Sequence, residues 1–186
     1  MNKRGFTLIE ALIVIMVTMM MTSILITSSR TSNKQIILFK EQALLINTLS
    51  RAKALALSGF QPSLTTGDTP DPVCGWGVHF PEDGKSYILF KDLGTIIPKP
   101  SCVSAGTYSD DETFETFTLD PAIQVSDLTP TVNAKLDVVF RPPQPTVYIN
   151  GVTGTSATQA SVSLGIIGAP NASTITITQG GQISVE

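Results

Sequence analysis

A run of 53 residues without proline or glycine constrains the fold of this chain more than any other feature. The run extends from Phe6 to Ser58, and a continuous helix of that length would measure about 80 Å. Gly59 and Pro62 then supply the signals that end a helix. A single domain of ordinary size has no use for so long a helix, so we expect its two halves to lie in different surroundings.

The first half of this segment predicts a membrane span. No charged residue occurs from Ala11 to Ser29, and these 19 residues would rise about 28 Å as a helix, close to the roughly 30 Å of a hydrocarbon core. Lys3 and Arg4 precede the apolar run, which predicts a cytoplasmic N-terminus. We therefore expect residues 6–29 to cross the inner membrane once, with the C-terminal part on the periplasmic or extracellular side.

The second half of the segment predicts an amphipathic helix. Its apolar residues recur every three, four or seven positions, and polar residues lie between them. The expected apolar stripe consists of Ile36, Phe39, Ala43, Ile46, Leu49, Ala56 and Phe60. We expect this stripe to cover one side of a folded domain.

The composition changes after the long helix, where residues 59–73 form a turn-rich linker. Nine short runs with β character follow, and turn signals separate them. These runs cover residues 75–80, 86–90, 113–119, 122–126, 136–140, 146–149, 160–166, 173–178 and 182–185. The sequence therefore predicts an α+β fold, in which the long N-terminal helix (residues 6–58) packs on an antiparallel, β-sandwich-like domain formed by residues 74–186.

The charge pattern argues against nucleic acid as a partner. The net charge is −3, the sequence pI is about 5.1, and no Lys or Arg follows Arg141, whereas DNA binding requires clustered cations. The sequence contains no phosphate-binding loop, nucleophile elbow or pair of catalytic carboxylates. We therefore expect neither an enzyme nor a cofactor.

Two features bear on metal binding. His79 is the only histidine, which excludes a His-rich site. The acidic cluster between Asp110 and Glu115 has the carboxylates that calcium prefers, but a solvated loop has the same composition. Calcium binding is left open on these grounds, and no metal is predicted.

Cys74 and Cys102 are the only cysteines. They are too few for a disulfide scaffold and lack the spacing of metal ligands. In an exported domain they can pair, and closing a loop of about 29 residues would stabilise the fold by roughly 3.5 kcal/mol. Two unrelated buried thiols are the alternative.

Glu10 separates two interpretations of the N-terminus. An ordinary signal peptide would be cleaved after the apolar run, near Ser28 or Ser29, and would leave a carboxylate inside that run without a role. The stretch KRGFTLIE, residues 3–10, instead resembles the prepilin leader of type IV pilins and type II secretion pseudopilins. The resemblance covers about the first 25 residues. Many major pilins carry a proline or glycine within the helix, which this chain lacks.

The resemblance implies how the N-terminus is processed. A prepilin peptidase would cleave between Gly5 and Phe6, remove the leader formed by residues 1–5, and leave Phe6 to be N-methylated. Glu10 would pair with the α-ammonium group of Phe6 in a neighbouring subunit. That pairing would offset the cost, on the order of 2–3 kcal/mol, of a carboxylate in a bilayer helix. Residues 6–29 would anchor the chain first and later form the core of a filament.

A further resemblance concerns the β domain. The stretches CGWGVHF, YILFKD and TITITQGGQISV are similar to those of GspH/FimT-type minor pseudopilins. This implies a structural subunit, a minor pilin or pseudopilin of a type II secretion pseudopilus or a type IV pilus. Its partners would be other pilin subunits and the inner-membrane assembly platform. A pilin-type subunit for adhesion or DNA uptake and a membrane-tethered secreted β domain are the alternatives.

Overall fold

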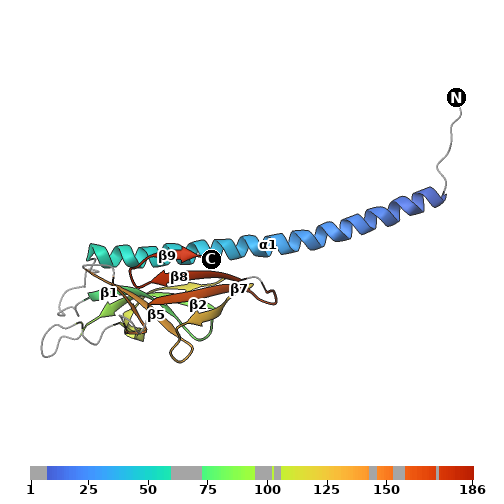
Figure 1. Cartoon of the computed structure of the whole chain (residues 1–186). Coiled ribbons are helices and arrows are strands. Elements are labelled where there is room, and N and C mark those ends of the chain that lie inside the picture. Colours follow the sequence, from blue (N-terminus) through green and yellow to red (C-terminus); the bar gives the residue numbers. More distant parts are fainter. Residues whose placement is uncertain are drawn as a thin grey trace, which may run out of the picture. The chain divides into compact units, whose positions relative to one another are not determined.

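The N-terminal part of the chain forms one helix, α1 (Leu8–Ser58), drawn from blue to turquoise in Figure 1. The computed structural model describes residues 8–59, 73–94, 102, 106–142, 146–152, 158–170 and 172–186. Gly59 ends the helix, because its φ of 61° is left-handed and its N–H donates to the carbonyl of Ala56 at 3.3 Å. The chain divides into two units, residues 1–37 and 38–186, which are described separately.

The described part of the C-terminal unit contains nine strands in two antiparallel sheets. The first sheet has the strand order β3-β2-β1-β5-β6, and the second has the order β4-β7-β8-β9. The strands are β1 (Val73–Phe80), β2 (Ser86–Leu93), β3 (Thr113–Thr118), β4 (Ile123–Thr129), β5 (Leu136–Arg141), β6 (Thr146–Ile149), β7 (Gln159–Ile166), β8 (Ala172–Thr178) and β9 (Ile183–Val185). All nine predicted β runs are confirmed, with bounds that differ by a few residues.

Among the described residues, two backbone hydrogen bonds link the two sheets. The N–H of Val125 in β4 donates to the carbonyl of Gly84, in the turn between β1 and β2, at 2.8 Å. The N–H of Val147 in β6 donates to the carbonyl of Gln179, in the turn between β8 and β9, at 3.1 Å. Each of these bonds joins a strand of one sheet to a turn of the other sheet.

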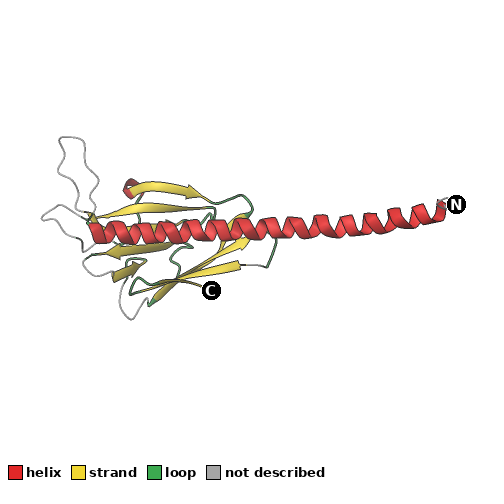
Figure 2. Cartoon of the chain, turned by 90° about the horizontal axis from the view of Figure 1, so that it is seen from above, coloured by secondary structure: helices red, strands yellow, loops and turns green. Residues whose placement is uncertain are grey.

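The C-terminal part of α1 lies over the strands and contacts both sheets (Figure 2). Arg51 Nη1 lies 2.6 Å from Oε2 of Glu115 in β3, and Lys53 Nζ donates to the carbonyl of Gly181, beside β9, at 2.8 Å. The predicted α+β fold, with a long helix packed on antiparallel sheets, is confirmed.

The face of α1 that packs on the strands differs from the predicted stripe. The buried residues are Leu38, Glu41, Leu45, Thr48, Leu49, Ala52 and Ala56. Only Leu49 and Ala56 belong to the predicted stripe, whereas Ile36 and Phe39 are 65% and 64% exposed; Phe60 lies outside the described residues. The stripe was wrong because apolar residues occur on several faces of this helix, as in the run from Leu44 to Ile46, so periodicity alone does not select one face.

Candidate functional site

A disulfide ties the segment before β3 to the first sheet. Cys74 of β1 and Cys102 are joined, with Cα atoms 5.6 Å apart. We call residues 106–112 the cover segment. Tyr108 of this segment stacks on His79 of β1, while Trp76 of β1 faces α1. Since side chains three positions apart on a strand point to opposite faces, the cover segment lies on the face of the sheet opposite α1.

A buried ion pair fixes the cover segment. The Asp92 carboxylate of β2 is fully buried, and its Oδ2 accepts from Nε of Arg141 in β5 at 3.0 Å. Its Oδ1 accepts from the N–H of Gly106 at 2.6 Å, and Arg141 Nη1 donates to the carbonyl of Cys102 at 3.0 Å. Burial raises the pKa of Asp92, and the charge of Arg141 opposes that shift.

A second buried pair lies further along β1. His79 Nδ1 is 2.5 Å from Oδ1 of Asp137 in β5, and Oδ2 of Asp137 accepts from the N–H of Tyr108 at 3.1 Å. The Tyr108 ring stacks on His79 with centroids 4.2 Å apart. The histidine is thus satisfied by one carboxylate and one ring, which gives it a structural role.

Within the acidic cluster, the carboxylate of Glu112 binds backbone N–H groups. Glu112 accepts from the N–H groups of Leu93 and Ser109 at 2.8 and 2.9 Å, and burial raises the pKa of its carboxyl group. Among the described residues, which include Asp110 and Glu115, no group of three or more His, Cys, Asp or Glu side chains could hold a metal ion.

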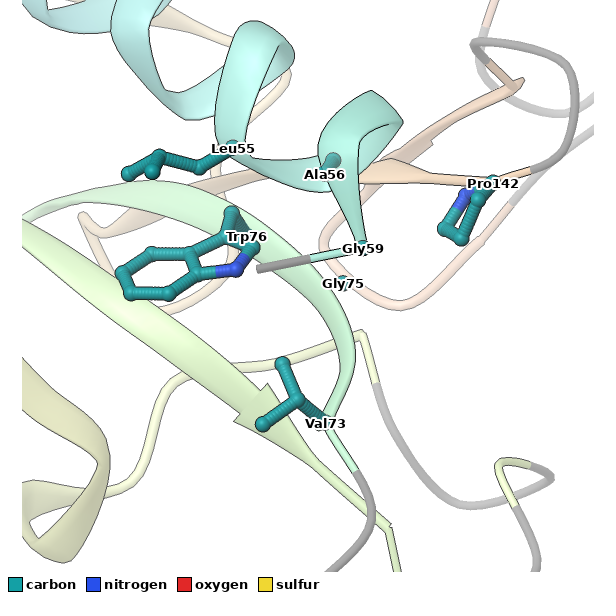
Figure 3. Close-up of a pocket in the computed structure, with 7 residues that line it drawn as sticks. All are labelled: Leu55, Ala56, Gly59, Val73, Gly75, Trp76 and Pro142. Carbon is teal, nitrogen blue, oxygen red and sulfur yellow. The ribbon is translucent and has the colours of Figure 1, made fainter. Parts of the chain in front are cut away.

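The pocket beneath the end of α1 is small. Its volume is about 20 Å³, enough for one water molecule but not for an organic ligand. Figure 3 shows the Trp76 side chain on β1, on the side of the strand where Leu55 of α1 lies. Trp76 is 1% exposed and packs edge-on against Phe114 with centroids 5.1 Å apart. This region is therefore core rather than a binding site.

The N-terminal unit presents an apolar helix whose described side chains are all exposed between Leu8 and Ile24. Glu10 lies in the first turn of α1, where the helix dipole favours a negative charge. The hydroxyl groups of Thr18 and Thr22 donate to the carbonyls of Ile15 and Thr18 at 2.9 and 2.7 Å. Because these hydroxyls are satisfied within the helix, they add little polarity to its outer surface.

Comparison with known families concerns this same segment. Residues 1–26 match the family model described as the prokaryotic N-terminal methylation motif. The chain carries a pilin-type methylation motif. The motif supports a type IV pilin-like precursor, which a prepilin peptidase processes and which assembles with other pilins in general. Proteins with this motif are structural subunits rather than enzymes, and the motif suggests a membrane-anchored precursor. Neither a curated protein nor a solved structure matches the chain.

The structure describes only part of the predicted N-terminal site. Glu10 is described, whereas Gly5 and Phe6 lie outside the described residues. Within the part of the chain that is described, no helix is both long and apolar enough to cross a membrane.

Sequence reasoning missed the residues that hold the cover segment. They form two ion pairs, Asp92 with Arg141 and His79 with Asp137, and the partners are 49 and 58 residues apart in the sequence. The available signal was a carboxylate between apolar residues of a strand, as at Asp92 between the run from Tyr87 to Phe90 and Leu93, although Lys91 beside it weakens that signal.

Proposed function

We propose that this chain is a prepilin that becomes a minor pilin or pseudopilin in a type II secretion pseudopilus or a type IV pilus. Cleavage falls between Gly5 and Phe6, and Phe6 is then N-methylated. The match of residues 1–26 to the methylation motif is the observation that carries the proposal. The similarity of the β domain to GspH/FimT-type pseudopilins favours a minor subunit over a major one.

The exposed apolar helix supports an assembly role. Twelve large apolar side chains between Leu8 and Ile24 are each about half or more exposed. A surface of this kind is covered by lipid or by other protein in its working state. Before assembly, residues 6–29 anchor the chain in the inner membrane with Lys3 and Arg4 on the cytoplasmic side. In the filament the same side chains pack against neighbouring helices.

Glu10 sets the axial position of each subunit. It is the only ionisable residue between Leu8 and Ser29, and its side chain is exposed on the first turn of α1. A carboxylate in an apolar medium costs on the order of 2–3 kcal/mol on insertion scales. An α-ammonium group of Phe6 in the preceding subunit offsets that cost, so docking is favoured in the register that brings the two charges together.

A pilin-type subunit for adhesion or DNA uptake is the second candidate. Strands β6 to β9 and the turns between them contain no Lys or Arg, which disfavours DNA. A membrane-tethered β domain without a filament role is the third candidate, and it predicts either cleavage near Ser29 or none.

The mass of the mature N-terminus tests the proposal. The protein is purified from membranes of a host that has a prepilin peptidase, and its terminal peptide is sequenced. A chain that begins at Phe6 and is heavier by one methylene group is expected. A chain that begins near Arg30 would show conventional signal-peptide removal and would exclude the filament role of Glu10. An intact chain that begins at Met1 would leave only the tethered β domain.

A further inference from the structure

Strand β3 is an edge strand of the five-stranded sheet, and we call the open side of such a strand a margin. It pairs with β2 on one side, and no other strand of that sheet follows it. Figure 2 shows it at the margin of the domain, directly after the short 3-10 helix η1 (Asp110–Glu112). The strand is preceded by the cover segment, and Arg51 of α1 contacts the side chains of Phe114 and Glu115.

The ladder with β2 shows which backbone groups of β3 point outward. The N–H of Leu119 donates to the carbonyl of Lys85 at 2.9 Å, just beyond the pair Ser86 and Thr118. Hydrogen-bonded pairs alternate with non-bonded pairs in an antiparallel ladder. The peptide groups of Thr116 and Thr118 are therefore directed away from β2, toward the open margin.

Of the other three edge strands, two form a hydrogen bond with a turn of the other sheet and the third is short. Val125 of β4 bonds to Gly84, and Val147 of β6 bonds to Gln179. Strand β9 has three residues. In contrast, none of the described residues forms a hydrogen bond with the outward peptide groups of Thr116 and Thr118.

Residues 115–118 of β3 lack most of the features that keep an edge strand from pairing with another chain. A bulge lies at Phe114, but residues 115–118 pair regularly with β2. The stretch contains neither Pro nor Lys. The side chains of Thr116 and Thr118 are exposed, and threonine favours the extended backbone of a paired strand.

The charge around β3 indicates what kind of strand it accepts. Asp110 and Asp111 are exposed just before the strand and Asp120 follows it, whereas Glu115 within the strand is already paired with Arg51. Residues 74–186 contain eleven acidic and five basic residues, so another copy of this domain would bring mostly negative charge to this margin. We propose that β3 binds an extended segment of a different protein, which adds to the sheet as a further strand and carries Lys or Arg at its ends.

A short peptide tests this proposal with the whole chain in detergent micelles. The probe alternates threonine and valine and has two lysines at each end. Binding is measured by calorimetry, and amide resonances of residues 115–118 are expected to shift. A probe with N-methylated alternate peptide groups, which cannot form a ladder, should bind at least about tenfold more weakly. A probe with glutamates in place of the lysines should lose a similar factor.

Variants of β3 separate strand pairing from simple charge attraction. Thr116→Pro removes an outward N–H and should weaken binding at least about tenfold. The double variant Thr116→Lys, Thr118→Lys keeps the backbone N–H and C=O groups of β3, and its added positive charge should weaken binding of the lysine-flanked probe. This variant still tests the proposal if Thr116→Pro does not fold. The double variant Gln124→Lys, Ser126→Lys on β4 is the matched control, because it adds the same two charges at another margin and should leave binding unchanged.

Two results would overturn the proposal. The first is no binding of the lysine-flanked probe, or equal binding of its N-methylated form. The second is self-association of the chain that the double lysine variant abolishes, because β3 would then pair with a second copy rather than with a basic partner.

Discussion

Arg141 of β5 reaches over Gly75 of β1 to bond with Asp92 of β2, its Nε 3.0 Å from the carboxylate Oδ2. Gly75 lies between them in the sheet, since it pairs with Asp92 on one side and its neighbour Trp76 pairs with Phe140 on the other. The missing side chain at Gly75 provides the path for the guanidinium group. The ion pair, and the hold that it has on the cover segment through Gly106, therefore depend on one glycine.

Gly75→Ala is expected to destabilise the domain by about 1–3 kcal/mol through overpacking. A Cβ atom at this position would lie 2.6 Å from the carbonyl oxygen of Phe140 and 3.0 Å from Cγ of Arg141, and the backbone oxygen cannot move cheaply. Urea denaturation measures the change. Gly180→Ala is the control, because its Cβ would meet only Thr178 Oγ1 at 4.0 Å, and it should change stability by less than about 0.5 kcal/mol. Equal effects at both positions would refute the account of Gly75.

Arg141→Met is expected to cost about 3–5 kcal/mol, because it leaves the buried Asp92 carboxylate without its cation. The double variant with Asp92→Asn should recover part of this loss, which a double-mutant cycle quantifies. Arg51→Met is the comparison. The Arg51 and Glu115 side chains are 45% and 42% exposed, so removing that pair should cost only about 0–1 kcal/mol. Similar losses for the two arginines would contradict the importance of burial.

Replacing both Cys74 and Cys102 by Ser is expected to lower the free energy of unfolding by about 3.5 kcal/mol, since the unfolded chain gains the entropy of an open loop. The fold should persist, because Asp92 and Arg141 still hold the cover segment through Gly106 and the backbone of residue 102. Thermal unfolding and circular dichroism of the variant measure both effects. Loss of the β spectrum at room temperature would show that the ion pair cannot hold the segment alone.

Glu112→Gln is expected to change how stability depends on pH. Burial raises the pKa of Glu112 above 4.5, so the folded protein binds the proton more tightly than the unfolded chain. The resulting stabilisation is complete below the pKa that Glu112 has in the unfolded chain. It is lost as the pH rises through the pKa that Glu112 has in the folded protein. The variant lacks this loss, so its free energy of unfolding should rise more, or fall less, than that of the native chain from about pH 4.5 upward. Denaturant titrations at several pH values measure how the free energy of unfolding changes with pH. A smaller slope in the variant than in the native chain would contradict a raised pKa of Glu112.

Glu10→Ala is expected to leave peptidase cleavage intact and to reduce assembled filaments by more than about tenfold, because the docking subunit loses the charge that selects its register. The terminal mass reports cleavage, and sheared filaments report assembly. Thr18→Val is the control, since the Thr18 hydroxyl bonds only to its own helix at Ile15, and it should assemble normally. Native amounts of filament from the alanine variant would remove Glu10 from the assembly step.

The features that could be predicted are local in the sequence. The end of α1 follows from Gly59, whose left-handed φ stops a helix. The strand β8 follows from its alternation, because Ile175 and Ile177 are buried while Thr174 and Thr176 are partly exposed. The methylation motif is likewise contained in the first 26 residues. Each of these signals is carried by residues within one turn, one strand or one short motif.

The tertiary structure alone decided which groups meet across the domain. The helix could bury several apolar faces, and packing on the strands selected the one with Leu38 rather than Phe39. The contact of Arg141 with Asp92 depends on the register of β1 between β2 and β5. A register of this kind is set by the core of the whole sheet, and a shift of one residue would turn each side chain to the other face. Local composition therefore determined the elements and the N-terminal motif, while strand register and helix packing determined the buried polar contacts.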